Sequence, residues 1–298
     1  MRWCSVSQSW EPCSPLMRSH NCLVKPEHMQ MPKAGSSQTD GVTHSSRIGV
    51  LIVWLFVLTY WALISFFGRA SSASHIPSVM TPEMWQNFLL DQLVVYAPVL
   101  VFLLLFVALY ERKERRGSKR TLLSSVGLTR VGLWKSVEWA LILILLLAPI
   151  SLALQGMQSL VFVKTGGSAP QPTTTSIPLS VLLVVVISSL ATAVTEETTV
   201  RGYFLDRLMP THPSTVGRSL DSVLIVSLMM ASYHAAPYLN TYGFSLPVTI
   251  VALVSVFVYS VFLSLAYVKS GVRNSIGPIL FHFLMDAGFY LVLFVAVG

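Results

Sequence analysis

The amino-acid sequence predicts an all-α protein that crosses a membrane about seven times. Of its 298 residues, 53% are hydrophobic and only 11% are charged. In an ordinary soluble domain roughly a quarter of the residues are charged. The apolar residues form continuous runs, and several runs approach the ~20 residues that a helix needs to cross hydrocarbon. So few charges cannot cover a soluble surface of this size. A lipid bilayer is therefore the expected surrounding of most of the chain.

The elements follow from the run lengths. Residues 1–46 are polar and rich in Ser, Pro and His, which predicts a disordered tail, and this tail holds all three cysteines, Cys4, Cys13 and Cys22. Helical spans are expected at residues 48–67, 93–110, 136–157, 177–200, 222–236, 247–268 and 276–297. We expect an N-terminal group of spans at 47–176, with a basic cytoplasmic loop at 111–135, and a later membrane domain at 177–298.

The positive charges predict the orientation of an integral membrane protein, which in a prokaryote lies in the cell membrane. The formal net charge is +7, and eighteen of the twenty Lys and Arg residues lie before the first span or after the second, fourth and sixth spans. By the positive-inside rule these segments face the cytoplasm. The N-terminus is then cytoplasmic and the C-terminus external. No nucleic-acid-binding motif accompanies the basic segments, so no nucleic-acid partner is expected.

The fourth span contains ionisable residues, which cost at least ~2.5 kcal/mol at the centre of a membrane helix. Glu197 and Arg201 stand four residues apart on one helix face, where they can form an ion pair. Glu196 is rotated by ~100° and faces elsewhere. In an apolar cavity it could act as a general base. The alternative is that these charges only mark the cytoplasmic end of the span.

Two of the histidines lie in apolar runs. His282 has Asp286 one helical turn further on, so the two side chains can form a hydrogen bond that fixes the imidazole tautomer. Glu196 and His234 are each nineteen residues from Thr215, the midpoint of the polar turn between their spans. Antiparallel helices leaving this turn at equal rise bring the two side chains to similar depth. The alternative for each histidine is a hydrogen bond that only packs helices together.

Other protease motifs are absent from the sequence, including the H-E-x-x-H zinc helix and the G-x-S-x-G nucleophile elbow. Over about residues 177–290 the sequence resembles the CPBP (CAAX protease and bacteriocin-processing) family of intramembrane proteases, which includes the type II CAAX prenyl endopeptidases. The resemblance is carried by EETTVRG at 196–202, MASYH at 230–234 and HFLMD at 282–286.

The resemblance implies a role for each motif residue. Glu196 and His234 would activate the attacking water, Glu197 and Arg201 would support the site, and His282 and Asp286 would stabilise the oxyanion. The chain departs from the family pattern at Met230, where Phe is usual, and at Val200, where an aromatic residue is common; both are apolar packing positions. Asp286 stands where Asn also occurs. An ionised Asp286 would repel an oxyanion, so it must be protonated or act only by orienting His282.

The sequence therefore predicts an endopeptidase that cleaves a membrane-associated or prenylated peptide near the cytoplasmic membrane face. The part played by a metal stays open, because Glu196, His234 and His282 also match a catalytic zinc set, with Zn²⁺ as the cofactor of a metalloprotease. Two other functions remain as alternatives. One is a membrane immunity or binding protein that does not cut its partner. The other is a proton-coupled transporter, since buried Glu, His and Asp residues also build proton relays.

Overall fold

The computed structural model of the protein describes residues 44–67, 81–112, 121–164, 179–209, 216–242, 244–271 and 273–296. These residues form helices and no strands, which confirms the predicted all-α class. Residues Asp40–Gly298 make up one compact unit. The predicted tail lies outside the described residues, apart from its last three residues, which begin the first helix.

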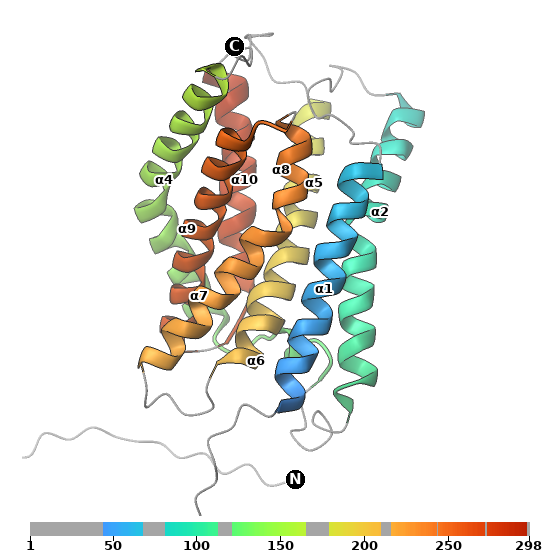
Figure 1. The fold of residues 1–298 in the computed structure, drawn as a ribbon, viewed down its shortest axis with the longest axis vertical. Coiled ribbons are helices and arrows are strands. Elements are labelled where there is room, and N and C mark those ends of the chain that lie inside the picture. Colours follow the sequence, from blue (N-terminus) through green and yellow to red (C-terminus); the bar gives the residue numbers. More distant parts are fainter. Residues whose placement is uncertain are drawn as a thin grey trace, which may run out of the picture. The chain divides into compact units, whose positions relative to one another are not determined.

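Each predicted span corresponds to a long helix, and long helices that follow one another in the chain run in opposite directions (Figure 1). The long helices are α1 (His44–Phe67), α2 (Pro82–Leu109), α4 (Leu133–Lys164), α5 (Leu179–Glu197), α7 (Val216–Tyr233), α9 (Leu246–Ser270) and α10 (Ile276–Ala296). The short elements are the 3₁₀-helix η2 (Ser124–Val126), the π-helix η3 (Thr198–Leu205), α6 (Asp206–Leu208) and α8 (Ala235–Thr241).

Six helical segments of the described part are long and apolar enough to cross a membrane. They are Arg47–Phe67, Pro82–Leu109, Leu133–Ile150, Leu182–Leu208, Ser219–Thr241 and Leu246–Ser270, and α10 adds the shorter apolar stretch Ile276–Gly288. Large apolar side chains cover the outside of the bundle; Leu145, for example, is 78% exposed. Apolar surface on this scale needs lipid rather than water around it. The protein is therefore an integral membrane protein.

Helix α2 begins at Pro82, well before the predicted start at residue 93. Thr81 is its N-cap, with the side-chain oxygen accepting a hydrogen bond from the Met84 backbone N–H at 3.3 Å. Pro82 fits the first helical turn because its missing N–H needs no partner there. Polar residues fill much of this first part, including Glu83 and Asp91, so a criterion based on apolar run length excludes it although it is helical.

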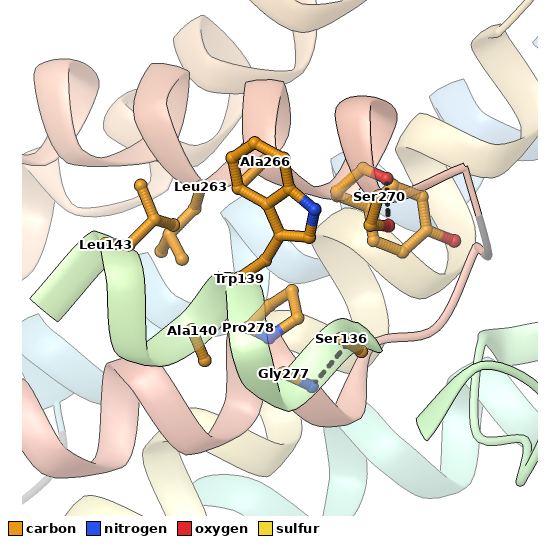
Figure 2. A pocket seen from close by; sticks show the side chains of 10 residues that line it. Ser136, Trp139, Ala140, Leu143, Leu263, Ala266, Ser270, Gly277 and Pro278 are labelled. Atoms are coloured by element: carbon orange, nitrogen blue, oxygen red, sulfur yellow. Dashed lines mark hydrogen bonds between the residues drawn. The ribbon is translucent and has the colours of Figure 1, made fainter. Parts of the chain in front are cut away.

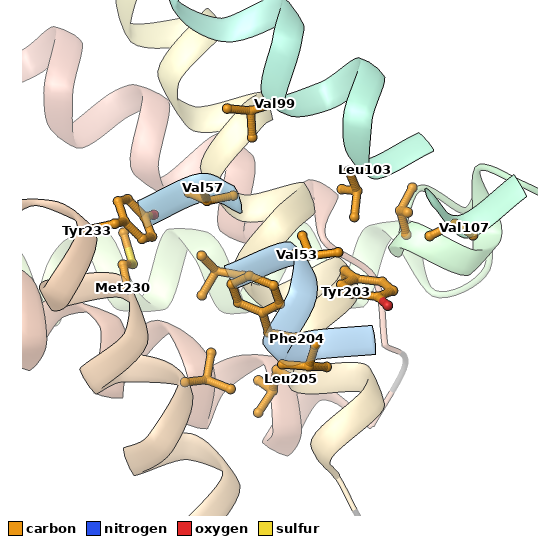
Figure 3. Close-up of a cluster of buried hydrophobic side chains, with 14 of the residues drawn as sticks. Val53, Val57, Val99, Leu103, Val107, Tyr203, Phe204, Leu205, Met230 and Tyr233 are labelled. Carbon is orange, nitrogen blue, oxygen red and sulfur yellow. The ribbon is translucent and has the colours of Figure 1, made fainter. Parts of the chain in front are cut away.

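The first two spans pack against the π-helix and α7 in one apolar cluster (Figure 3). Phe106 of α2 meets Tyr203 of η3 edge to face, with ring centroids 6.3 Å apart. The buried members include Val53, Val57, Val99, Leu103, Val107, Tyr203, Phe204, Leu205, Met230 and Tyr233. Helices α1 and α2 thus form part of the scaffold that holds the fourth and fifth spans together.

The segment before α4, predicted as part of a basic loop at 111–135, is packed into the fold where the structure describes it. Asn274, just before α10, donates side-chain hydrogen bonds to the backbone oxygens of Thr129 at 2.7 Å and Val131 at 3.0 Å. The Ser275 backbone N–H donates to the Gly127 oxygen at 2.9 Å. These bonds tie the start of α10 to residues 121–132, and so help to set the position of the third motif.

Gly202, in the π-helix, lies against the same segment. A Cβ on Gly202 would stand 2.0 Å from the Val126 carbonyl oxygen. Side chains never approach a backbone oxygen so closely, so only glycine allows this contact. The π-helix and the segment at 121–132 therefore pack backbone to backbone.

Candidate active site

The first motif lies inside a continuous helix rather than at the end of one. The predicted span at 177–200 ended near these residues, but α5 continues through η3 and α6 to Leu208. It continues because Val200, Tyr203 and Phe204 are fully buried and anchor the π-helix in the core. Glu197 and Arg201 are 0% exposed. Both side chains are therefore enclosed by the protein, and the helix that carries them does not end with them.

The predicted ion pair of Glu197 and Arg201 is present. Arg201 Nη1 lies 2.9 Å from Glu197 Oε1. Arg201 also donates to the backbone oxygen and the hydroxyl of Ser260 on α9, and Nη1 contacts the Met230 sulfur at 3.1 Å. A buried ion pair is favourable only when further hydrogen bonds satisfy its remaining groups, and Ser260 supplies such bonds here.

The second motif meets the first at Glu196, as the equal distances from Thr215 predicted. His234 Nε2 lies 3.3 Å from Glu196 Oε1, and His234 Nδ1 lies 2.8 Å from the Met230 backbone oxygen. A carbonyl oxygen only accepts hydrogen bonds, so Nδ1 carries a proton. This backbone contact leaves Nε2 as the nitrogen that faces Glu196. The turn around Thr215 itself lies outside the described residues.

His282 contacts all three carboxylates of the motifs. Its Nδ1 lies 2.8 Å from Glu197 Oε1, and its Nε2 lies 3.3 Å from Asp286 Oδ2 and 3.9 Å from Glu196 Oε2. The expected contact with Asp286 is present, but Glu197 is the nearer partner, and the sequence did not predict it. Because carboxylates only accept, the two shorter contacts are both hydrogen bonds when the imidazole carries a proton on each nitrogen.

The motif side chains therefore form one cluster rather than two separate couples. Glu196 and Glu197 lie at its bottom with 5% and 0% of their side-chain surface exposed, His234 and His282 are 15% and 14% exposed, and Asp286 is 35% exposed. The cluster thus opens at Asp286. A buried carboxylate beside two imidazoles can move a proton, and a partly open site can admit a reactant to it.

A metal does not fit the arrangement of these side chains. Glu196, His234 and His282 are of the types that bind catalytic zinc. Among the described residues, however, no group of three or more His, Cys, Asp or Glu side chains is placed to hold a metal ion. The ring nitrogens of both histidines instead face protein oxygens. We therefore derive no step through a metal.

Two contacts of the site have no signal in the sequence. Ser260 is one of several serines in an apolar span, and such hydroxyls are common in membrane helices. Met230 was expected to fill an apolar gap, and it does lie in the core, but its sulfur and its backbone oxygen also contact Arg201 and His234. Residue type and spacing do not distinguish Ser260, and the place of Met230 in the second motif does not reveal that it contacts Arg201.

A small cavity lies elsewhere, between α4, α9 and α10 (Figure 2). Its volume is about 10 Å³, room for one water molecule at most. Ser136 Oγ stands at its edge, where it donates to the Asn274 backbone oxygen and accepts from the Gly277 N–H. None of the motif residues lines this cavity, so it is separate from the cluster of Glu196 and the histidines.

Comparison with known families assigns the later part of the chain. Residues 178–288 match the family model described as type II CAAX prenyl endopeptidase Rce1-like. The matched region begins at the start of α5 and ends just after Asp286, so it contains all three motifs. No curated protein and no solved structure matches the chain.

Proposed function

Residues 178–288 belong to the type II CAAX prenyl endopeptidase Rce1-like family of intramembrane proteases, and on this premise we propose that the protein hydrolyses a peptide bond with a water molecule activated by Glu196 and His234. Residues 177–298 are the catalytic domain in this proposal. Glu197, Arg201, His282 and Asp286 complete its site.

The contact between Glu196 and His234 carries the proposal. His234 Nε2 points at Glu196 Oε1 across 3.3 Å, and one proton lies between them because two lone pairs would otherwise face each other. Glu196 Oε2 has no hydrogen-bond partner among the described residues. Its lone pairs are unused, so a water molecule that enters the site could give it a proton, which is the task of a general base.

The proposed reaction assigns each proton. As the water oxygen bonds to the carbonyl carbon, Glu196 takes the water proton and the carbonyl oxygen becomes an oxyanion. The peptide C–N bond then breaks, and the Glu196–His234 couple returns the proton to the leaving amine. His282 Nε2 lies 3.9 Å from Glu196 Oε2, so the imidazole stands close to where the water would bind. Its one Nε2–H faces Asp286 at 3.3 Å, and in the proposed reaction it is shared with the oxyanion as that charge forms.

The two remaining carboxylates orient His282. Glu197 holds Nδ1 at 2.8 Å, and Asp286 holds Nε2 at 3.3 Å. In this proposal Asp286 contacts the ring and not the oxyanion, so His282 stands between the two negative charges. Arg201 offsets the charge of Glu197, which would otherwise be costly in a buried position.

The proposed substrate is a peptide segment of a membrane-associated protein. The first two motifs lie on helices long enough to cross a membrane, and His282 and Asp286 lie on the shorter apolar stretch of α10. The proposed substrate therefore reaches these residues from within or beside the bilayer. The family is described as type II CAAX prenyl endopeptidase Rce1-like. We therefore propose a prenylated CAAX peptide as the substrate, because a prenyl chain would hold a peptide at this depth. With the N-terminus cytoplasmic and the C-terminus external, as the positive charges predict, cleavage takes place near the cytoplasmic face.

The test uses the full chain in lipid nanodiscs with a farnesylated CAAX peptide and the same peptide without the lipid, followed by mass spectrometry. We expect Glu196→Gln and His234→Ala to lower the cleavage rate by about 10²- to 10⁴-fold. Glu138→Gln is the control, because Glu138 is an exposed carboxylate on α4. Full cleavage by Glu196→Gln would show that another group activates the water.

One observation also favours proton transport. The side chains from Asp286 through His282 to Glu196 and His234 form a continuous series of contacts. Such a series can pass protons through a membrane protein. Proton-driven solute uptake by liposomes that contain the protein would favour a transporter if the Glu196→Gln variant loses this uptake. The other alternative is an immunity or binding protein that does not cut its partner. Protection of cells or binding of a partner that is unchanged in Glu196→Gln would favour it.

A further inference from the structure

Helix α9 carries none of the three motifs, yet it supplies two partners to the buried arginine of the site. Arg201 Nη2 lies 2.8 Å from the hydroxyl of Ser260 and 3.0 Å from its backbone oxygen. Both residues are 0% exposed. Ser260 therefore holds one end of the guanidinium from a helix that the sequence motifs do not include.

Ser260 stands at one end of a series of contacts that leads to His282. At the other end of the guanidinium, Arg201 Nη1 lies 2.9 Å from Glu197 Oε1, and that oxygen lies 2.8 Å from His282 Nδ1. A guanidinium is planar and rigid. Fixing Nη2 therefore restricts where Nη1 can lie, and Nη1 in turn restricts Glu197 Oε1.

The hydroxyl has no substitute among the described residues. Both hydrogen bonds of Nη2 go to Ser260, and Arg201 Nε has no hydrogen-bond partner in that part of the chain. Loss of the hydroxyl leaves a buried cationic group with one backbone acceptor on Nη2. A buried guanidinium that lacks an acceptor moves toward other acceptors. Because the Glu197 carboxylate is bonded to Arg201, it would move as well.

We propose that Ser260 is a positioning residue of the site: its hydroxyl fixes the Arg201 guanidinium, which holds Glu197 against His282. The inference rests on the proposed function, because the histidine it positions is the one assigned to the oxyanion. The proposal predicts that removal of the Ser260 hydroxyl on α9 alters the hydrogen bonding of the His282 imidazole on α10.

Ser264 provides a matched control. It lies one helical turn further along α9 and is also 0% exposed. Its hydroxyl has no hydrogen-bond partner among the described residues. Ser260→Ala and Ser264→Ala thus remove the same atom from the same helix at the same burial, and only the first removes a bond to Arg201.

The experiment combines two measurements on the full chain in nanodiscs. Solid-state NMR of the protein with ¹⁵N-labelled histidine reports the ring nitrogens of His282, which are assigned by their loss in His282→Gln. We expect Ser260→Ala to shift these signals and Ser264→Ala to leave them in place. With the farnesylated peptide, Ser260→Ala should lower kcat by about tenfold with little change in KM.

The outcomes separate the inference from the proposed function. Unchanged His282 signals in Ser260→Ala, or equal shifts in both serine variants, would overturn the positioning role. Absence of peptide cleavage by the unmodified protein would instead reject the proposed function. The NMR comparison would still decide whether Ser260 positions His282, because it needs no turnover.

Discussion

His282 Nδ1 lies 2.8 Å from Glu197 Oε1, and this contact joins the third motif to the first. The same oxygen lies 2.9 Å from Arg201 Nη1. One carboxylate oxygen thus serves both a buried ion pair and the histidine that we assign to the oxyanion. A change in any of these three side chains is expected to affect both the stability of the helix bundle and the geometry of the site.

The first prediction concerns the ion pair. Glu197→Gln leaves the Arg201 guanidinium buried without a countercharge, and we expect it to lower the free energy of unfolding by about 3–5 kcal/mol. Arg201→Gln leaves the Glu197 carboxylate buried without the arginine and should lower the free energy of unfolding by a similar amount. The double variant should lose less than the sum of the two, because neither charge then remains alone. Reversible unfolding in mixed micelles measures all three, with Glu138→Gln as control. Additive losses would mean that the two side chains do not stabilise each other.

The second prediction concerns Asp286. Asp286→Asn keeps an oxygen that can accept from His282 Nε2 and removes only the charge, so cleavage should stay within about threefold of the unmodified rate if Asp286 orients the ring. Asp286→Ala removes the acceptor and should lower kcat/KM by about 10- to 100-fold. Peptide cleavage followed by mass spectrometry compares the two variants. If Asn proves as damaging as Ala, the carboxylate acts through its charge rather than as a hydrogen-bond acceptor.

The third prediction concerns Gly202. In Gly202→Ala the new Cβ would stand 2.0 Å from the Val126 carbonyl oxygen, so the π-helix or the segment at 121–132 has to move. We expect a loss of about 1–3 kcal/mol in the free energy of unfolding. Gly288→Ala is the control, because a Cβ on Gly288 meets nothing within 4 Å. Equal stability of the two variants would show that the backbone contact is easily relaxed.

Contacts that depend on short sequence distances were predicted well. The ion pair of Glu197 and Arg201 and the contact of His282 with Asp286 both join residues four apart on a helix. Helical geometry alone brings such residues together. The meeting of Glu196 and His234 was predictable for a similar reason, because two helices that leave one turn at equal rise match in depth.

Contacts that depend on the rotation of helices were not predicted. The bonds from Glu197 to His282 and from Arg201 to Ser260 join helices that are distant in the sequence. The π-helix at 198–205 also turns its residues to different directions from those of a regular α-helix. No residue type marks that change. The length of the fourth span was underestimated because its charges are paired inside the protein instead of ending the helix.

The sequence by itself determined that this is an all-α membrane protein and roughly which residues form the middle of each span, because apolar run length and the cost of burying charge act locally along the chain. It also located the three motifs that place ionisable residues within those spans. Only the tertiary structure decided that Glu196 and Glu197 lie under both histidines in a single cluster, and that Ser260 of α9 holds Arg201. These relationships arise when helices pack against one another, and the angle at which each helix faces its neighbours is a property of the whole bundle.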